Sequence, residues 1–367
     1  MLLPNLRGDG AVGMMLALAK GFSGYSHQVD LLIVRAEGER SSSMPDGVTV
    51  IPLRAKRPLF AVPALVRYLR RTKPDFLVAT EHYSGLPALY AIILARTHTR
   101  CVIRQDNTWG MDSQRFTGRH KIVTPWMVGR LFRRSEIVAV SKGVARDFVD
   151  HFPQLANNVQ VIYNPVVTAE LRERSLALPE HPWLAPGEPP VVVAVGRLTA
   201  AKGFDLLIDA FARVTATVRS RLLILGEGPD RSALQARIRA HDLESACQLV
   251  GYQPNPLAFI ASANVFVLSS RFEGLPTVLI EALCTNTPVI ATDCPSGPRE
   301  ILADGKYGML IPPNDVGLLA QAISESVRRP PPRDANLNAW LQQFAADTSV
   351  KRHLALFDAS LASLPPS

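Results

Sequence analysis

The chain has 367 residues, of which 47% are hydrophobic and 20% are charged, and its formal net charge is +8. This length and composition are typical of a protein with two globular domains, and they exclude a largely disordered chain. The longest nearly apolar stretch, residues 86–95, is far shorter than the roughly 18 residues of a membrane-spanning helix, and no secretory signal is recognisable, so we expect a cytoplasmic protein.

Short β-branched runs alternate with stretches of helical spacing, and the alternation starts afresh in the second half. The expected strands are 29–34, 48–53, 76–80, 101–104, 137–141 and 159–163, then 191–195, 221–225, 248–251, 265–269, 289–293 and 309–312. Such alternation predicts an α/β protein with two doubly wound, Rossmann-like parallel-sheet domains that face a central cleft. Only residues 1–4 precede the first glycine turn, so we expect the first strand to be truncated or its start misassigned, with the loss of a central strand.

A proline-rich segment separates the two halves. Residues 178–190 contain five prolines, which favour a stiff, non-helical connection. We therefore expect a first domain at 1–166, a linker at 167–190 and a second domain at 191–346. Helical spacing at the end of the chain predicts a last helix, at about 347–367, that packs back on the first domain.

The glycine turn near the start reads Gly8-Asp-Gly10-Ala-Val-Gly13, and Glu37 ends the next expected strand. Read literally, this is the fingerprint of a dinucleotide site, and it keeps an NAD-dependent dehydrogenase open as an alternative. A plain tight turn, or one that faces the cleft between the domains, is the other interpretation.

The first half is basic: residues 1–166 hold 22 Lys/Arg against 12 Asp/Glu, whereas residues 167–367 hold 18 against 20. The basic residues are interleaved with apolar ones at 54–60, 67–73 and 115–134. This pattern indicates an anionic membrane surface or an anionic acceptor as partner, with a solvated surface as the alternative. We expect attachment to the inner face of the cell membrane, and no nucleic-acid partner because no binding module is recognisable.

In the second half, charged residues follow an expected strand and flank an expected helix. Gly196, Arg197 and Lys202 come after the strand 191–195, at the sheet edge where open α/β folds bind ligands. A helix that opens at Pro276 or Thr277 presents unpaired amides that suit a phosphate. Glu273 and Glu281, which we expect to lie close together across that helix start, can accept sugar hydroxyls. The combination predicts a sugar-nucleotide site, although either cation alone could be a solvated loop charge.

Neither a metal nor a prosthetic cofactor is expected. No Asp-x-Asp pair or His cluster is present, and the four cysteines form no Cys-x-x-Cys pair, so we interpret them as reduced, mostly buried thiols. Gly226 and Gly228 follow the next strand and are expected to form a turn at the same cleft.

Six sequence strings now occur together and in order. They are Ala-Val-Ser-Lys-Gly-Val at 139–144, Val-Ile-Tyr-Asn-Pro at 161–165, Gly-Arg-Leu-x-x-x-Lys-Gly at 196–203, Gly-Glu-Gly-Pro at 226–229, Glu-Gly-Leu-Pro at 273–276 with a second glutamate at 281, and Pro-Val-Ile-Ala-Thr-Asp at 288–293. In these strings the chain resembles the retaining glycosyltransferases of the GT-B fold, in the family 4 group (glycosyl transferases group 1).

The resemblance implies roles for individual residues. Arg197 and Lys202 are expected to bind the donor diphosphate, Glu281 the ribose and Glu273 the transferred sugar. The neighbouring donor-site residues are expected to be Gly8, Gly10, Gly196, Gly226, Gly228, Gly251, Tyr252 at the base, Gly274, Leu275, Pro276 and Thr277. Catalysis is expected from Glu273, Arg197 and Lys202.

One position departs from the family pattern. Relatives often carry a histidine where Asp106 stands in Arg-Gln-Asp-Asn, so Asp106 either positions a sugar or marks an altered enzyme. The resemblance implies transfer of a hexose or N-acetylhexosamine from a nucleotide donor, for which we expect UDP, to a glycan or lipid-linked glycan, with retention of configuration, in cell-surface polysaccharide synthesis. A non-catalytic sugar-nucleotide binder is the second alternative.

Overall fold

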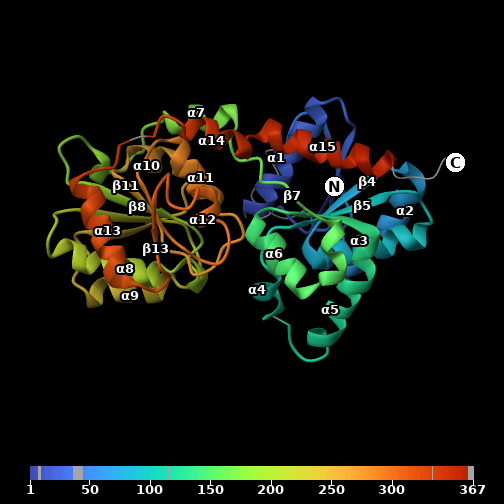
Figure 1. Ribbon diagram of the computed structural model, residues 1–367, viewed down its shortest axis with the longest axis horizontal. Coiled ribbons are helices and arrows are strands. Elements are labelled where there is room, and N and C mark those ends of the chain that lie inside the picture. The colour runs from blue at the N-terminus through green and yellow to red at the C-terminus, as the bar shows by residue number, and fades with distance from the viewer. Residues whose placement is uncertain (7–9, 36–43, 115, 333, 363–367) are drawn as a thin grey trace. The chain divides into compact units, whose positions relative to one another are not determined.

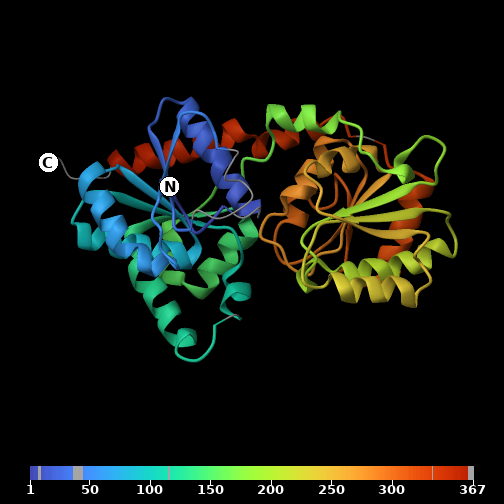
Figure 2. The same cartoon turned by 180° about the vertical axis from the view of Figure 1, so that it is seen from behind.

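The computed structural model describes residues 1–6, 10–35, 44–114, 116–332 and 334–362. The chain folds into two compact units. The first comprises Met1–Pro165 and the described residues from Gln343 onward, and the second comprises Val166–Gln342. In each unit the strands form a central sheet with helices on both faces (Figure 1), and the same layers are visible from behind (Figure 2). The expected α/β class with two parallel-sheet, Rossmann-like domains is confirmed.

The sheet of the first unit has seven parallel strands in the order β3-β2-β1-β4-β5-β6-β7. They are β1 (Leu2–Leu3), β2 (Val29–Ile33), β3 (Val48–Pro52), β4 (Phe76–Thr80), β5 (Arg100–Gln105), β6 (Ser135–Ala139) and β7 (Val159–Val161). The expected strands correspond to β2–β7 and differ from them only at their ends.

The expected loss of a central strand is wrong. β1 is only two residues long, but it lies between β2 and β4, where Leu2 pairs with Leu32 and with Ala79. Backbone bonds extend the pairing beyond the strand, because the Leu32 amide donates to Met1 O and the Val34 amide donates to Leu3 O. A central position satisfies both edges of the strand, so even two residues are held in register.

Helices cover both faces of this sheet. They are α1 (Gly10–Gly24), α2 (Val62–Thr72), α3 (Glu81–Ala95), α4 (Trp109–Ser113), α5 (His120–Leu131), α6 (Lys142–His151) and α15 (Ala346–Ala362), with short 3-10 segments at Pro58–Ala61, Phe132–Arg134, Pro153–Asn158 and Gln342–Phe344. Successive strand residues enter opposite cores: Leu2 and Leu77 pack on one face, whereas Leu3 and Val78 pack on the other. This alternation is the period-2 geometry of a strand that is buried on both faces.

The last helix, α15, belongs to the first unit. Val350 and Leu356 pack into the same core as Met15 and Phe22 of α1. The Ser349 hydroxyl, buried to 1% exposure, donates to the carbonyl oxygen of Tyr163 at 2.7 Å. The end of the chain is thereby fastened to the segment that follows β7.

The sheet of the second unit has six parallel strands in the order β10-β9-β8-β11-β12-β13. The strands are β8 (Val191–Val195), β9 (Arg221–Leu225), β10 (Cys247–Gly251), β11 (Val265–Leu268), β12 (Val289–Thr292) and β13 (Met309–Ile311). The helices are α7 (Ala169–Ser175), α8 (Phe204–Thr215), α9 (Arg231–Ala240), α10 (Pro256–Ser262), α11 (Thr277–Cys284), α12 (Pro298–Ile301), α13 (Val316–Arg328) and α14 (Leu337–Leu341), with 3-10 turns at Pro182–Leu184 and Ala200–Lys202.

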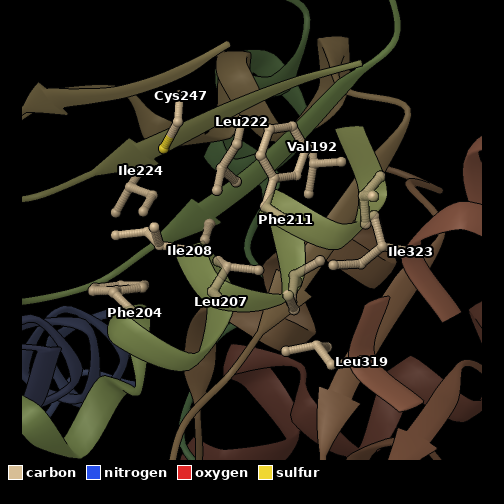
Figure 3. Packing of buried hydrophobic residues seen from close by; sticks show 14 of the residues in the cluster. Val192, Phe204, Leu207, Ile208, Phe211, Leu222, Ile224, Cys247, Leu319 and Ile323 are labelled. Atoms are coloured by element: carbon tan, nitrogen blue, oxygen red, sulfur yellow. The ribbon is translucent and has the colours of Figure 1, made fainter. Parts of the chain in front are cut away.

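The core of this unit forms where α8 and α13 pack on the sheet. α8 places Phe204, Leu207, Ile208 and Phe211 at spacings of three and four residues, which gives one apolar face. That face packs on Val192, Leu222 and Ile224 of the strands and on Leu319 and Ile323 of α13 (Figure 3). The packing fixes the start of α8, and with it the loop between β8 and α8.

The expected linker at 167–190 is instead part of the second unit. Its first half forms α7, capped where the Thr168 hydroxyl accepts from the Leu171 amide. Arg174 donates to Pro254 O and accepts from the Asn255 amide through its own carbonyl, which ties α7 to the start of α10. The prolines stop helix formation only after residue 178, so the composition gave too early a start for the connection.

Candidate functional site

The strand order of the second unit creates a switch point beside β8. The chain runs from β8 outward to β9 and β10 on one side, and then returns to β11 on the other side of β8. The loops that leave the carboxyl ends of β8 and β11 consequently diverge, and open α/β sheets bind ligands in the crevice that this divergence leaves. The first loop carries Arg197 and Lys202, and the second carries Glu273.

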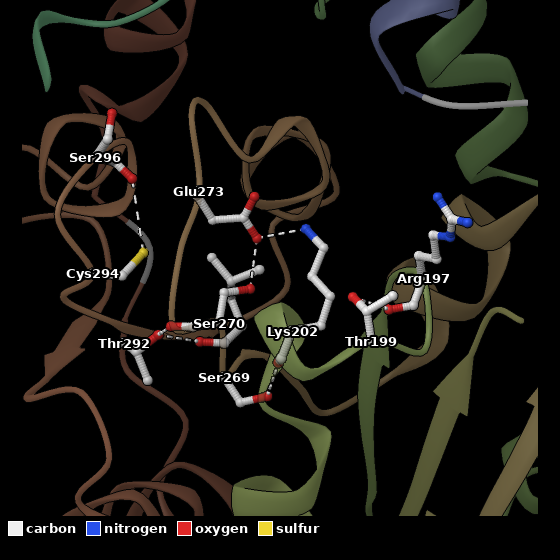
Figure 4. A network of polar contacts seen from close by, with 10 residues as sticks. Arg197, Thr199, Lys202, Ser269, Ser270, Glu273, Thr292, Cys294 and Ser296 are labelled. Carbon is white, nitrogen blue, oxygen red and sulfur yellow. Dashed lines mark hydrogen bonds and ion pairs between the residues drawn. The ribbon is translucent and has the colours of Figure 1, made fainter. Parts of the chain in front are cut away.

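Lys202 and Glu273, 71 residues apart in the sequence, form an ion pair. The Lys202 Nζ lies 2.6 Å from Oε1 of Glu273, with the two side chains 24% and 9% exposed. The same oxygen accepts from the Ser270 hydroxyl at 2.6 Å. Figure 4 shows Lys202 between Arg197 and Glu273, with its amine turned toward the carboxylate. A cation and an anion are therefore held side by side at the switch point.

Hydroxyl groups fasten the surrounding loops to one another. Ser269 donates to the carbonyl oxygen of Lys202 at 2.9 Å, which joins the loops after β8 and β11. Thr292 donates to the carbonyl oxygen of Ser270, and Ser296 donates to that of Gly274 at 2.8 Å, which adds the loop after β12. The charged pair thus stands on a rigid base, as a preorganised site requires.

A second ion pair supports the base of the loop. Arg271 contacts both carboxylate oxygens of Asp205, at 2.8 and 2.7 Å, and also donates to Ala200 O at 2.8 Å. This forked hydrogen bonding holds the pKa of Asp205 below its usual range. Our sequence reasoning missed Asp205, Ser270 and Arg271, although two serines and an arginine directly after a buried strand were a usable signal.

Arg197 lies in the same loop but is exposed to solvent. Among the described residues its guanidinium has no hydrogen-bond or ion-pair partner, and only its backbone carbonyl accepts, from Thr199. Its charge is thus available to an anion beside the Lys202 and Glu273 pair (Figure 4).

Helix α11 begins at Thr277, with Pro276 as its N-cap residue. The amides of a first helical turn have no partner within the helix, and the helix dipole adds positive potential there. Gly274, Leu275 and Pro276 are buried between Glu273 and this helix start. The predicted helix start at Pro276 or Thr277 is confirmed, and the binding of a phosphate there stays a prediction.

Glu281 lies in α11, four residues after the helix start at Thr277. Its expected closeness to Glu273 stays a prediction. Burial raises the pKa of Glu281, and the opposing influence comes from Arg174 of α7. The expected role of Glu281 with the ribose stays a prediction.

Two glycine turns let the loops at this edge approach closely. A Cβ at Gly226, whose φ is +133°, would collide with the carbonyl oxygen of Gly196, and one at Gly228 would collide with that of Leu198. Only glycine permits this contact. Gly251 ends β10, two strands away from β8, and the residue after it, Tyr252, is 64% exposed.

The remaining predicted residues lie in the first unit. Asp106 follows β5 and pairs with Arg104 at 3.0 Å, with its side chain 10% exposed. Gly10 is the first residue of α1, which also contains Gly13, and Gly8 and Glu37 lie outside the described residues. The literal dinucleotide fingerprint is thus only partly described.

Neither metal clusters nor membrane spans are found in the parts of the chain that the structure describes. These residues contain no group of three His, Cys, Asp or Glu placed to hold a metal ion. They also contain no helix with the length and apolar character to cross a bilayer. The four cysteines are free, and burial raises the pKa of each thiol to about 12.

The sequence profiles of two families cover most of the chain. The profile described as Glycosyltransferase Family 4 matches residues 8–170, and the one described as Glycosyl transferases group 1 matches residues 180–339. An uncharacterized glycosyltransferase of Methanocaldococcus jannaschii is 30% identical over 71% of this chain and 69% of its own length. The N-acetylgalactosamine-N,N'-diacetylbacillosaminyl-diphospho-undecaprenol 4-alpha-N-acetylgalactosaminyltransferase of Campylobacter jejuni is 28% identical over 71% of this chain and 70% of its own length.

A solved structure has the same fold. The Anabaena HepE structure in complex with UDP superposes with a TM-score of 0.76, over 99% of both chains, at 20% sequence identity. At this identity the likeness establishes the GT-B arrangement of two parallel-sheet domains but no substrate. The two family profiles and the relative of Methanocaldococcus jannaschii show that the chain belongs to the group 1 glycosyltransferases of the family 4 type.

Proposed function

We propose that the protein transfers a hexose or an N-acetylhexosamine from a UDP-sugar to a glycan or lipid-linked glycan, with retention of configuration, in the synthesis of cell-surface polysaccharide. The observation that carries this proposal is the ion pair of Lys202 and Glu273 at the switch point in the sheet of the second unit. One partner suits a diphosphate, and the other suits sugar hydroxyls. The substrate assignments have support in the names of relatives, since one acts on a diphospho-undecaprenol-linked glycan and a neighbouring structure holds UDP.

In this mechanism Lys202 and Arg197 bind the donor diphosphate. The bond between the anomeric carbon and the phosphate oxygen breaks, and the departing UDP takes its electron pair. Both cations and the first amides of α11 stabilise the charge that builds up on the diphosphate. The acceptor hydroxyl attacks from the same face, and a phosphate oxygen takes its proton. These groups supply the positive charge from the protein itself, so we propose that no divalent metal is needed.

Glu273 orients the donor ring. Its Oε1 is already held by Lys202 and Ser270, which fixes the carboxylate before the sugar arrives. Its second oxygen can accept a sugar hydroxyl. When the diphosphate binds, Lys202 gains a second anionic partner without leaving the first, because an ammonium group has three donors.

Ligand binding tests the proposal directly. UDP at 100 times its Kd should stabilise the protein by about 2.7 kcal/mol, whereas NAD should not raise its Tm. The measurement is thermal unfolding with each ligand, with and without EDTA. Because no divalent metal is needed in the proposed mechanism, EDTA should not change the stabilisation by UDP. Stabilisation by NAD alone would refute the donor assignment, and UDP binding without product from any labelled UDP-sugar would leave a non-catalytic binder.

We also propose that the first unit docks on an anionic membrane through α5. On this helix Ile122, Val123 and Trp126 are 77%, 45% and 67% exposed. Their spacing places all three on one side of the helix. The segment 113–135 contains six Lys/Arg and no Asp or Glu. An apolar side flanked by cations is the pattern that binds anionic lipid headgroups.

Replacing Ile122 and Trp126 by serine should weaken vesicle binding by about tenfold or more, because two exposed apolar side chains no longer enter the lipid interface. The measurement is cosedimentation with vesicles that contain phosphatidylglycerol, compared with pure phosphatidylcholine. Leu178, which is 88% exposed in the second unit, provides the matched control through Leu178→Ser. Equal binding by the double variant and the native protein would refute docking through α5.

A further inference from the structure

Arg104 is a charged side chain in the interior of the first unit. It projects from β5 and is only 1% exposed, and it ranks among the largest fully buried side chains of the described chain. Its Nη2 donates to Oδ1 of Asp106 at 3.0 Å and to Oδ1 of Asn164 at 2.5 Å. Its Nε is buried and has no partner among the described residues.

Stability does not account for this arrangement. A buried ion pair is often no more stable than well-packed apolar residues of similar volume, because removal of both charges from water costs so much. Here the cost is only partly offset, since Arg104 has one carboxylate partner and an unpaired nitrogen. Its charge also adds to the burial that lowers the pKa of His353, in α15, to about 3. A group that remains buried under these conditions has a reason other than packing.

The contacts of Arg104 converge on Asp106. Arg104 is the second-last residue of β5 and Asp106 directly follows the strand, where the two side chains are in contact. Arg104 holds Oδ1 of Asp106, whereas Oδ2 accepts from no group among the described residues. The carboxylate is therefore fixed at one oxygen and available at the other, at the carboxyl edge of a parallel sheet where ligands bind.

Asn164 connects the same arginine to the end of the unit. It is 6% exposed and lies just before Pro165, the last residue of the first segment of this unit. The preceding residue, Tyr163, is fastened through its carbonyl to Ser349 of α15, and its ring packs on Phe344. Arg104 thus joins Asp106 to the place where the chain leaves the first unit and where it returns.

We propose that Arg104 is a positioning residue. It keeps Asp106 ionised and oriented so that Oδ2 accepts a substrate hydroxyl. It also connects this carboxylate to Asn164, where the chain leaves the first unit. The inference rests on the proposed sugar transfer. It explains how aspartate serves at a position where a histidine is usual in the family, because a carboxylate without a cation in this interior would take up a proton and lose its capacity to accept.

The charged groups around Asp106 determine its pH dependence. Burial raises the pKa of Asp106, and Arg104 opposes that rise. Burial raises the pKa of the nearby Tyr83 hydroxyl. The carboxylates of Glu81 in α3, Asp106, and Asp112 in α4 raise that pKa further. These neighbours are acidic or neutral, and His353 stays uncharged above about pH 3. Arg104 is thus the cation that keeps Asp106 ionised among the groups described around it.

The experiment follows kcat/KM against pH for sugar transfer by the full-length protein. Loss of an opposite charge in contact with a carboxylate moves its pKa by roughly 1 to 3 units. In Arg104→Met the fall of kcat/KM on the acid side of the profile, its acid limb, should therefore shift to higher pH by about that amount, and the rate should recover above it. Arg104→Lys keeps the charge but loses the guanidinium that bonds both Asp106 and Asn164, so it should lower the rate without moving the acid limb.

A double-mutant cycle separates this role from a structural one. In the Asp106→Asn background Arg104→Met should change kcat/KM by no more than about twofold, because the arginine then has no carboxylate to hold. The double variant also removes both buried charges, which keeps the test valid if Arg104→Met alone fails to fold. UDP binding measured by thermal shift reports on the second unit in every variant.

An unmoved acid limb in Arg104→Met, or equal losses in both backgrounds, would overturn the inference while leaving sugar transfer intact. Absence of transfer by the native protein from every labelled nucleotide sugar would instead overturn the proposed function, and the positioning role with it.

Discussion

Replacement of Lys202 by alanine should lower kcat for sugar transfer by about 100-fold or more, by comparison with the loss of a single preorganised donor to a developing negative charge. The Lys202 amine is held 2.6 Å from Glu273, and the Ser269 hydroxyl donates to the carbonyl oxygen of Lys202, so both ends of the lysine are fixed. Without it, Arg197 and the helix amides alone face the departing diphosphate. The effect should fall on kcat more than on KM, because the charge to be stabilised is largest in the transition state.

The measurement is steady-state transfer from a labelled UDP-sugar, together with UDP affinity. Lys306→Ala is the matched control: Lys306 is also in the second unit, is 51% exposed, and lies 3.9 Å from Asp334 and 5.0 Å from the ring centroid of Tyr307. It should keep native kcat. Native turnover by Lys202→Ala, with the variant folded and UDP bound, would remove the lysine from the mechanism.

Glu273→Gln should also slow transfer, since a neutral amide orients the donor ring less firmly than a carboxylate.

Replacement of Gly226 by alanine should destabilise the second unit by more than about 3 kcal/mol, through a strained backbone and a direct collision. The φ of Gly226 is +133°, a region that residues with a side chain rarely adopt, and the new methyl group would run into the carbonyl oxygen of Gly196. That carbonyl belongs to the loop of Arg197 and Lys202. We therefore expect lost UDP binding as well as lower stability.

Thermal unfolding should show the destabilisation as a fall in Tm of about 10 °C. Gly317→Ala provides the control in the same unit. Gly317 lies in the first turn of α13, where an added Cβ meets Asp315 and Arg213 only at ordinary contact distances of 3.4 and 3.5 Å. Because alanine is the better helix former, this variant should change stability by no more than about 1 kcal/mol. Equal melting of Gly226→Ala and native protein would show that the close approach is not required.

The sequence predicted the strands well because they are buried on both faces. Runs such as Val191–Val195 and Val265–Leu268 are continuously apolar and end at charged or glycine-containing loops, so pattern and structure agree. Prediction failed where the signal was too short or was mixed. Two apolar residues at Leu2–Leu3 do not announce a central strand, and the prolines after residue 178 hid the helix at Ala169–Ser175.

The sequence by itself determined which chemical groups this protein has: Arg197 and Lys202 after one strand, Glu273 and a helix start after another, and Asp106 in a basic half. Only the tertiary structure decided which of them meet. Strand order brings Lys202 to Glu273 across 71 residues, and the folding of α7 into the second unit lets the charge of Arg174 act on the buried Glu281. Sequence spacing measures distance along the chain, whereas contact depends on which strands lie side by side and on how each helix is turned, and both follow from packing of the whole unit.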